Sequence, residues 1–319
     1  MTQVEERPTA PPDRPARSGR RRPALLAAAV AVLALAATAA GIGLAVAGGD
    51  ETAGPATTTT AASAGTTTAA PRPATSLTTA TPATTAVPPT VATWPAGVKP
   101  PPLDAPVAEL RPTLDGAAPV TSARASVPEV AVYARPLAAP AAEFADWRFP
   151  ATTQFGSPTV FLVTGTAGEW LRVRVPMKPN ELEGWVHNSE VALAPVATRL
   201  VVELASRTVQ LYDGDRLVAE SISVIGTDAT PTPTGLYYVT DLLQMEDPTG
   251  VYGPFVLATS ARSDAFELFN GGEPIVALHG TNQPSLLGSA ASNGCVRLPN
   301  DVVTELVQRT ALGTPVFVV

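Results

Sequence analysis

The distribution of aromatic residues divides this chain of 319 residues into two parts that differ in their capacity to fold. None of its aromatic residues (4 Trp, 5 Tyr and 8 Phe) precedes Trp94. Large rings, together with branched aliphatic side chains, supply most of the apolar area that a core buries. The segment before Trp94 therefore cannot form an ordinary globular unit. The remainder is long enough for one large domain or two small domains.

Charge and residue counts exclude several classes of function. The formal net charge is −7, but residues 1–22 carry six Arg against three acidic residues, so the rest of the chain carries −10. An acidic remainder argues against nucleic-acid binding by neutralisation of phosphates. One Cys and two His exclude an intramolecular disulfide and a clustered zinc site of the usual kind.

An uncharged apolar segment at residues 24–47 predicts a transmembrane helix or signal anchor. Half of its 24 residues are Ala, and at about 1.5 Å per residue it can cross a hydrocarbon layer of ~30 Å. The arginines at 20–22 predict a cytoplasmic tail over residues 1–23 and an exported C-terminal part. Ala45-Val46-Ala47 also fits a signal-cleavage site, so a secreted product is the alternative. The sequence thus predicts a single-pass membrane protein whose folded part lies outside the cytoplasm.

Two segments follow the predicted span. Residues 48–119 are rich in Thr, Ala and Pro, which predicts a disordered or extended linker. Residues 120–196 contain short strands with period-two alternation, which indicates a small β-barrel or sandwich. The stretch WLRVRVPMKPNELEGWVHNSEV resembles the end of a bacterial SH3-like domain, of the kind that precedes wall-remodelling catalytic domains. Such a module could bind wall peptide or only position the next domain.

Residues 197–319 predict a second domain that is mainly β, with one or two short helices. Alternating apolar positions favour strands along most of this segment. Asn300 is expected to cap a helix over residues 301–310, and Gly313 to end it. Residues 314–319 are apolar and predict a buried terminal strand.

The single cysteine, Cys295, lies in a polar loop sequence, SNGCVRL, sixteen residues after His279. A free cysteine is often only a small buried apolar residue, which is one alternative here. A thiol with an unperturbed pKa of ~8.5 needs a base to react at neutral pH, and an imidazole within hydrogen-bond reach can supply it. The backbone N–H groups of Gly294 and Cys295 could then stabilise an oxyanion. A thiol, a base and oxyanion donors together suit an acyl-transfer reaction.

The stretch HGTNQPSLLGSAASNGCVRL resembles the active-site signature of the L,D-transpeptidase (YkuD-type) family, in which HGT is followed by S-x-G-C-[IV]-R-[LM]. The segments TPTGLYYV, YGPF and GTPVFVV also fit that family in order. The resemblance implies that Cys295 is the nucleophile and His279 the general base. It further implies pocket or substrate-binding positions at Tyr252, Gly280, Thr281, Ser292, Gly294 and Arg297. Asn293, also expected at the substrate site, stands where many members have His, which puts acceptor binding and pH dependence in doubt.

The same resemblance implies a peptidoglycan reaction. The thiolate would attack the bond between the L-diamino acid and the terminal D-Ala of a stem tetrapeptide, release D-Ala and transfer the acyl group to an acceptor amine. A neighbouring stem as acceptor gives a 3→3 cross-link, water gives an L,D-carboxypeptidase, and a protein amine attaches that protein to the wall. By the same resemblance, no metal or organic cofactor is expected, and carbapenems are expected to acylate Cys295. A non-catalytic wall-binding protein is the alternative from another class, and a monomer is expected.

Overall fold

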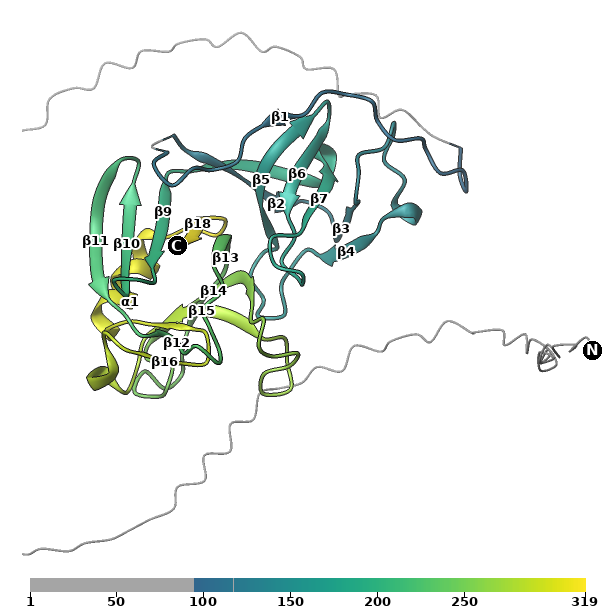
Figure 1. The fold of residues 1–319 in the computed structure, drawn as a ribbon. Helices are drawn as coiled ribbons and strands as arrows, with labels where there is room; N and C mark the ends of the chain where they lie inside the picture. The colour runs from purple at the N-terminus through teal and green to yellow at the C-terminus, as the bar shows by residue number, and fades with distance from the viewer. Residues whose placement is uncertain (1–94, 117) are drawn as a thin grey trace, which may run out of the picture. The chain divides into compact units, whose positions relative to one another are not determined.

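The computed structural model describes residues 95–116 and 118–319, which belong to one compact unit. The prediction of a mainly β protein with a short helix is confirmed: the described residues form eighteen strands, one α-helix and three short 3-10 helices (Figure 1). The predicted span at 24–47 lies outside the described residues. Within the described part of the chain, no helix is long and apolar enough to cross a membrane.

The described residues up to 196, here called the N-terminal module, form an antiparallel sheet in the order β7-β6-β5-β2-β8, with β1 beside β5. A separate hairpin pairs β3 with β4. Alternating side chains from these strands, among them Val130, Phe161 and Val173, form one buried core. The bounds are β1 Ala108–Glu109, β2 Val120–Ala125, β3 Glu129–Val132, η1 Ala142–Phe144, β4 Trp147–Pro150, β5 Val160–Ala167, β6 Trp170–Arg174, β7 Glu183–His187, η2 Asn188–Glu190 and β8 Val191–Val196.

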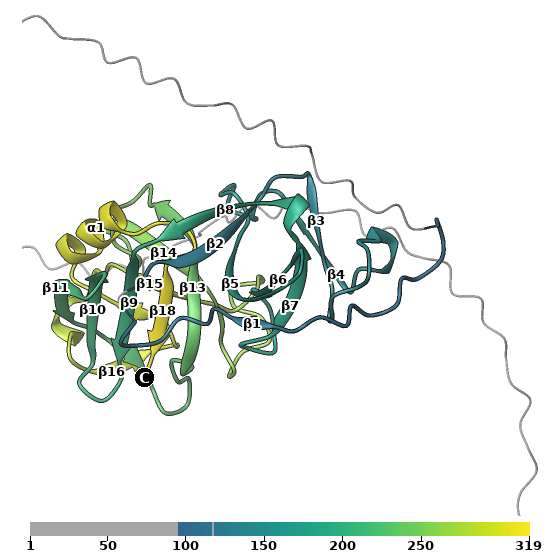
Figure 2. The ribbon, with the colours of Figure 1, turned by 90° about the horizontal axis from the view of Figure 1, so that it is seen from above.

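Residues 197–319, here called the C-terminal domain, contain an eight-stranded sheet in the order β11-β10-β9-β18-β13-β14-β15-β17. The helix α1 packs against β14 and β15 (Figure 2). A short parallel pair, β12 with β16, lies apart from this sheet. The bounds are β9 Thr198–Glu203, β10 Thr208–Asp213, β11 Arg216–Ile222, β12 Ile225–Gly226, β13 Gly235–Gln244, β14 Phe255–Arg262, β15 Ile275–His279, η3 Pro284–Leu286, β16 Ala290–Ser292, β17 Val296–Arg297, α1 Asn300–Arg309 and β18 Pro315–Val318.

Both ends of α1 differ from the sequence prediction. Asn300 is the first helical residue rather than the cap; Pro299 holds the cap position without a side-chain hydrogen bond. The Asn300 side chain faces another loop, where its Oδ1 accepts a bond from Thr281 N–H. The helix ends at Arg309, and Gly313, with φ of +87°, lies in the turn before β18. Tertiary bonding of Asn300 therefore overrides the local capping preference.

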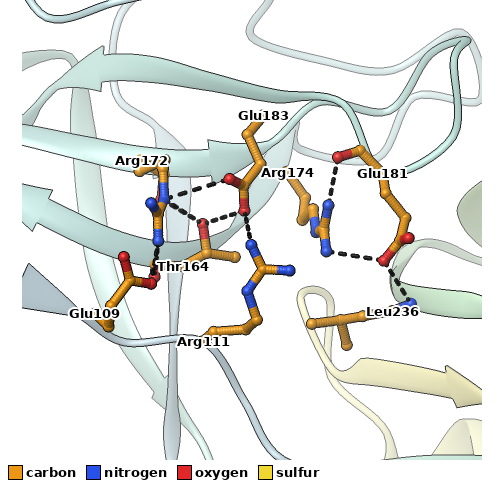
Figure 3. A network of polar contacts seen from close by, with 8 residues as sticks. All are labelled: Glu109, Arg111, Thr164, Arg172, Arg174, Glu181, Glu183 and Leu236. Atoms are coloured by element: carbon orange, nitrogen blue, oxygen red, sulfur yellow. Dashed lines mark hydrogen bonds and ion pairs between the residues drawn. The ribbon is translucent and has the colours of Figure 1, made fainter.

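Part of the predicted linker is packed on the N-terminal module. Strand β1 pairs with β5, and Leu103 packs against the buried ring of Trp170 and its neighbours. Arg111 forms an ion pair of 2.8 Å with Glu183, and Glu109 pairs with Arg172 (Figure 3). The boundary predicted at residue 120 is therefore too late, because strand pairing and ion pairs recruit a Pro-rich segment that has little core of its own.

The N-terminal module and the C-terminal domain share polar contacts and a buried cluster. Arg174 binds Glu181 at 2.9 Å, and the same carboxylate oxygen accepts Leu236 N–H at 3.1 Å (Figure 3). Strand β5 and three strands of the C-terminal domain contribute apolar side chains to one cluster: Val160, Leu162, Val201, Leu236, Tyr238 and Phe317. Each such side chain stabilises its contact by about 1.5–3 kcal/mol when fully buried.

Candidate active site

The register of β15 with β17 brings Cys295 and His279 to the same edge of the sheet. The two strands are parallel, with Leu278 opposite Val296 and His279 opposite Arg297. Residues two apart in an extended chain face the same side, so Cys295 emerges on the side that carries His279. The Cys295 Sγ atom lies 3.9 Å from the carbonyl oxygen of Ile275 on β15. The one thiol of the chain and the one imidazole of this domain thus occupy one edge.

The imidazole of His279 is held in one tautomer. The side chain is buried, and its Nδ1 lies 2.6 Å from the carbonyl oxygen of Gly280. Because a carbonyl oxygen only accepts, Nδ1 carries the proton and Nε2 keeps its lone pair. Burial lowers the pKa of His279 to about 4; the bond to Gly280 opposes this change, and the charge of Arg297 adds to it. The ring is therefore neutral at pH 7 and can accept a proton at Nε2.

The thiol of Cys295 is protonated at neutral pH. Burial raises its pKa above the ordinary value, while the backbone of Ala277 and the charge of Arg297 act in the opposite direction. The residue is nevertheless partly exposed, so a reactant can approach. A protonated thiol becomes an active nucleophile only when a base removes its proton, and the neutral imidazole of His279 is the candidate base on the same side of the sheet.

Ser292 braces the loop that carries the cysteine. Its Oγ donates to the carbonyl of Cys295 at 2.6 Å and accepts the N–H of Gly294 at 3.1 Å. Thr232 Oγ1 donates to the Gly294 carbonyl at 2.9 Å, and Gly294 has φ of +109°, which favours glycine. The expected oxyanion donor at Gly294 is thus already bonded in this structure, because a nearby serine hydroxyl competes for local N–H groups. Ser292 is buried and shapes the loop.

Gly280 and Thr281, which directly follow β15, lie in close contact with the first residue of α1. Thr281 N–H donates to Asn300 Oδ1 at 2.7 Å, and Thr281 Oγ1 accepts Gln283 N–H at 3.0 Å. A Cβ on Gly280 would stand 2.3 Å from Asn300 Oδ1 and 2.9 Å from Gly253 Cα. Asn300 therefore supports the site, a role that the sequence analysis missed because Asn before a helix is usually read as a cap.

The remaining predicted residues lie around this pair at different distances. The Tyr252 ring is 5.0 Å from the His279 ring, at an angle of 68°. Burial raises the pKa of Tyr252, and the nearby thiolate of Cys295 would raise it further. Arg297 donates to Gln283 Oε1 at 3.2 Å on the exposed side of β17. Asn293 is exposed in the loop before the thiol. Of these three, Tyr252 is the one in contact with the candidate base.

Among the described residues, no group of three or more His, Cys, Asp or Glu side chains is placed to hold a metal ion.

Comparison with known proteins gives the C-terminal domain a family match. Residues 197–318 match the family model of the L,D-transpeptidase catalytic domain, YkuD. A candidate L,D-transpeptidase named YkuD from Bacillus licheniformis is 33% identical over 120 residues, which cover 38% of this chain and 64% of that protein. Its namesake from Bacillus subtilis is 29% identical over 119 residues, which cover 37% and 64%. The chain therefore spans less than two thirds of the length of these relatives.

Among solved structures, an L,D-transpeptidase from Mycobacterium smegmatis is 15% identical, with a TM-score of 0.31 over 47% of this chain and 89% of that chain.

Proposed function

We propose that this protein is a peptidoglycan L,D-transpeptidase that uses Cys295 as nucleophile and His279 as general base. The observation that carries the proposal is the β15–β17 register, which brings these two side chains to one sheet edge. The family match of residues 197–318 supports the reaction class. The substrate would be the stem tetrapeptide of peptidoglycan, and the acceptor amine of a second stem would yield a 3→3 cross-link.

In the first half-reaction, Nε2 of His279 takes the proton of the Cys295 thiol. The thiolate then attacks the carbonyl carbon between the L-diamino acid and D-Ala, and the electron pair of the C=O bond moves to oxygen. The N–H of Cys295 is the proposed backbone donor to this oxyanion. Collapse breaks the C–N bond, the leaving amine of D-Ala takes the proton from His279, and a thioester remains.

In the second half-reaction, the acceptor amine attacks the thioester carbonyl and passes a proton to His279. The C–S bond breaks, and the thiolate recovers that proton. The tautomer set by Gly280 supports both halves, because Nε2 stays available as acceptor while Nδ1 keeps its hydrogen bond.

The remainder of the chain fits an extracytoplasmic enzyme. The segment at 24–47 would anchor it in the membrane, and the Thr/Ala/Pro-rich segment after it would act as a spacer. The N-terminal module, proposed to be SH3-like, would position the C-terminal domain against the wall.

Intact-mass analysis of the full chain in detergent tests the proposal. The chain is incubated with a purified disaccharide-tetrapeptide and separately with a carbapenem, and dimer and tripeptide products are counted. The wild type should gain the mass of the acyl group and form 3→3 dimers. Cys295→Ala should gain none, and His279→Gln should react about 10²–10⁴-fold more slowly.

His187→Gln is the matched control, because His187 is the other histidine and lies in the N-terminal module. It should acylate at the wild-type rate. A folded wild type that gains no mass with either reagent would refute the proposal in favour of a wall-binding protein. Tripeptide without dimer would point to hydrolysis of the same acyl-enzyme.

A further inference from the structure

A cleft of about 280 Å³ lies on the sheet of the C-terminal domain, where the N-terminal module covers it. The sheet side comes from β13, β14 and the start of β15. The covering side comes from the segment after β3 that includes β4 and from the loop after β6. Six lining residues matter here: Thr153, Phe155, Asp241, Arg262, Glu273 and Ile275.

Asp241 is the unusual group in this cleft. Its side chain is almost wholly buried, with 2% of the residue exposed, and one oxygen accepts a bond from the hydroxyl of Thr153. No ion pair among the described residues includes Asp241. Other charged side chains of the two parts do form ion pairs, such as Arg174 with Glu181 and Arg262 with Glu273. Carboxylates are rarely buried unless a cation or several donors compensate the charge. Asp241 therefore lines the cleft with one hydrogen bond, from Thr153, and without an ion-pair partner among the described residues.

Arg262, the basic residue among those that line the cleft, is already engaged. Its guanidinium binds the carboxylate of Glu273 at 2.8 Å and the carbonyl of Pro176 at 2.7 Å. It also donates to Thr259 O at 3.2 Å. Arg262 and Glu273 thus pair with each other, which leaves Asp241 as the lining carboxyl without an ion-pair partner among the described residues.

Ile275 links the cleft to the candidate active site. This residue lines the cleft, and its carbonyl oxygen is 3.9 Å from Cys295 Sγ. Ile275 and His279 are four positions apart on β15, so their side chains face the same side of the sheet. A ligand that extends from the thiol along this face of β15 toward Ile275 would run toward the cleft.

We propose that the cleft is a subsite for a free ammonium group of the stem peptide, with Asp241 as the anion that binds it. This inference rests on the proposed function, because the diamino acid whose carbonyl reacts with Cys295 also carries a side-chain amine. An ammonium group offers three donors, and the Asp241 carboxylate and the hydroxyls of Thr153 and Thr240 can accept them. A peptide whose amine is blocked loses this contact.

Isothermal titration of the full chain carrying Cys295→Ala in detergent tests the subsite without turnover. The probes are a soluble stem tetrapeptide with a free side-chain amine and the same peptide with that amine acetylated. The free amine should bind at least tenfold more tightly. Asp241→Asn, which keeps an acceptor for Thr153, should remove this preference. Asp215→Asn, at an exposed hairpin turn, should retain it.

Two results would overturn the subsite: equal affinity for the two peptides, including no measurable binding of either, or an unchanged preference in folded Asp241→Asn. The proposed function is judged separately, by the carbapenem adduct on chains that retain Cys295. An adduct on both wild type and Asp241→Asn, together with a lost amine preference, supports the subsite. Failure of the adduct on wild type contradicts the enzyme, while the titration still decides the subsite.

Discussion

Thr281 N–H donates a hydrogen bond of 2.7 Å to Asn300 Oδ1, which joins the segment just after His279 to the first residue of α1. Gly280, whose carbonyl orients the imidazole, lies between His279 and Thr281 in the chain. The helix that follows the cysteine segment therefore fixes the turn that follows the histidine. One amide side chain links the two halves of the candidate site.

Replacing Asn300 should weaken both stability and acylation. Asn300→Ala leaves the buried Thr281 N–H without its partner, which costs about 1–3 kcal/mol in the free energy of unfolding. We expect urea denaturation to show this loss, and the rate of carbapenem acylation to fall about tenfold. Asn300→Asp keeps an acceptor and should recover most of both. Gln308→Ala, on the exposed side of the same helix, is the control; a loss of equal size there would argue against the link.

Ser292→Ala should both slow the acylation of Cys295 and destabilise the fold. The variant removes the hydroxyl that bonds both Gly294 N–H and the Cys295 carbonyl, so the loop loses its brace. We expect the free energy of unfolding, measured by urea denaturation, to fall by about 1–3 kcal/mol. The acylation rate, measured by quenched-flow mass spectrometry, should fall about tenfold to hundredfold. Ser206→Ala, at an exposed turn, serves as control. Wild-type rates in folded Ser292→Ala would contradict the bracing role.

At low pH, the rate of acylation should follow the protonation of His279. Because burial lowers its pKa to about 4, the ring remains an acceptor down to that pH. Acylation of Cys295 should therefore decline with an inflection near pH 4, well below the ordinary histidine value. A pH profile of the carbapenem reaction measures this directly. An inflection near pH 6.5 would mean that the imidazole is not buried as described.

The same pKa predicts how stability depends on pH. The unfolded chain, with a histidine pKa near 6.5, binds more protons than the folded chain between pH 6.5 and 4. Stability from this group is thus complete above pH 6.5 and falls by about 3 kcal/mol as pH drops to 4. His187 also has a pKa lowered by burial and acts in the same direction. The test compares the free energy of unfolding of wild type and His279→Gln between pH 7 and 4. The variant should lose less stability as the pH falls.

Residues 95–116 should contribute to stability although their composition predicts a linker. A chain beginning at Pro95 keeps β1, the packing of Leu103 and the ion pair of Arg111 with Glu183. A chain beginning at Ala118 loses all three, so its free energy of unfolding should be lower by about 2–4 kcal/mol. Equal denaturation midpoints for the two chains would show that this segment does not contribute.

Local pattern was enough to predict several strands, among them the terminal strand. Strands β6 and β10 alternate apolar and polar residues, and α1 buries Val303 and Leu306 as helical spacing predicts. The motif around Cys295 also carried the functional hypothesis. These features depend on residues close in sequence, or on a signature specific enough to stand alone.

Contacts distant in sequence could not be predicted in the same way. Asn300 satisfies both a helix-cap pattern and a bond to Thr281, and only the folded arrangement decides between them. Gly294 N–H could reach an oxyanion or Ser292 Oγ, and the loop conformation selects the second. Asp241 gave no signal at all, because its burial depends on the covering N-terminal module.

Gly280 should be the least replaceable glycine near the site. In Gly280→Ala the new Cβ would meet Asn300 Oδ1 at 2.3 Å and Gly253 Cα at 2.9 Å, and the second of these is backbone that cannot rotate away. Relief requires the turn to open, which shifts the Gly280 carbonyl away from His279 Nδ1. We expect a loss of about 1–3 kcal/mol in stability, as for other overpacked sites, and acylation at least tenfold slower.

Gly272→Ala is the matched control, because its Cβ would have a nearest neighbour at 3.9 Å in an exposed loop. Thermal unfolding and carbapenem acylation of both variants decide the point. If Gly280→Ala retained wild-type acylation and stability, the turn would have to be loose enough to accept a methyl group. The imidazole orientation would then depend on something other than the close packing of Gly280, Gly253 and Asn300.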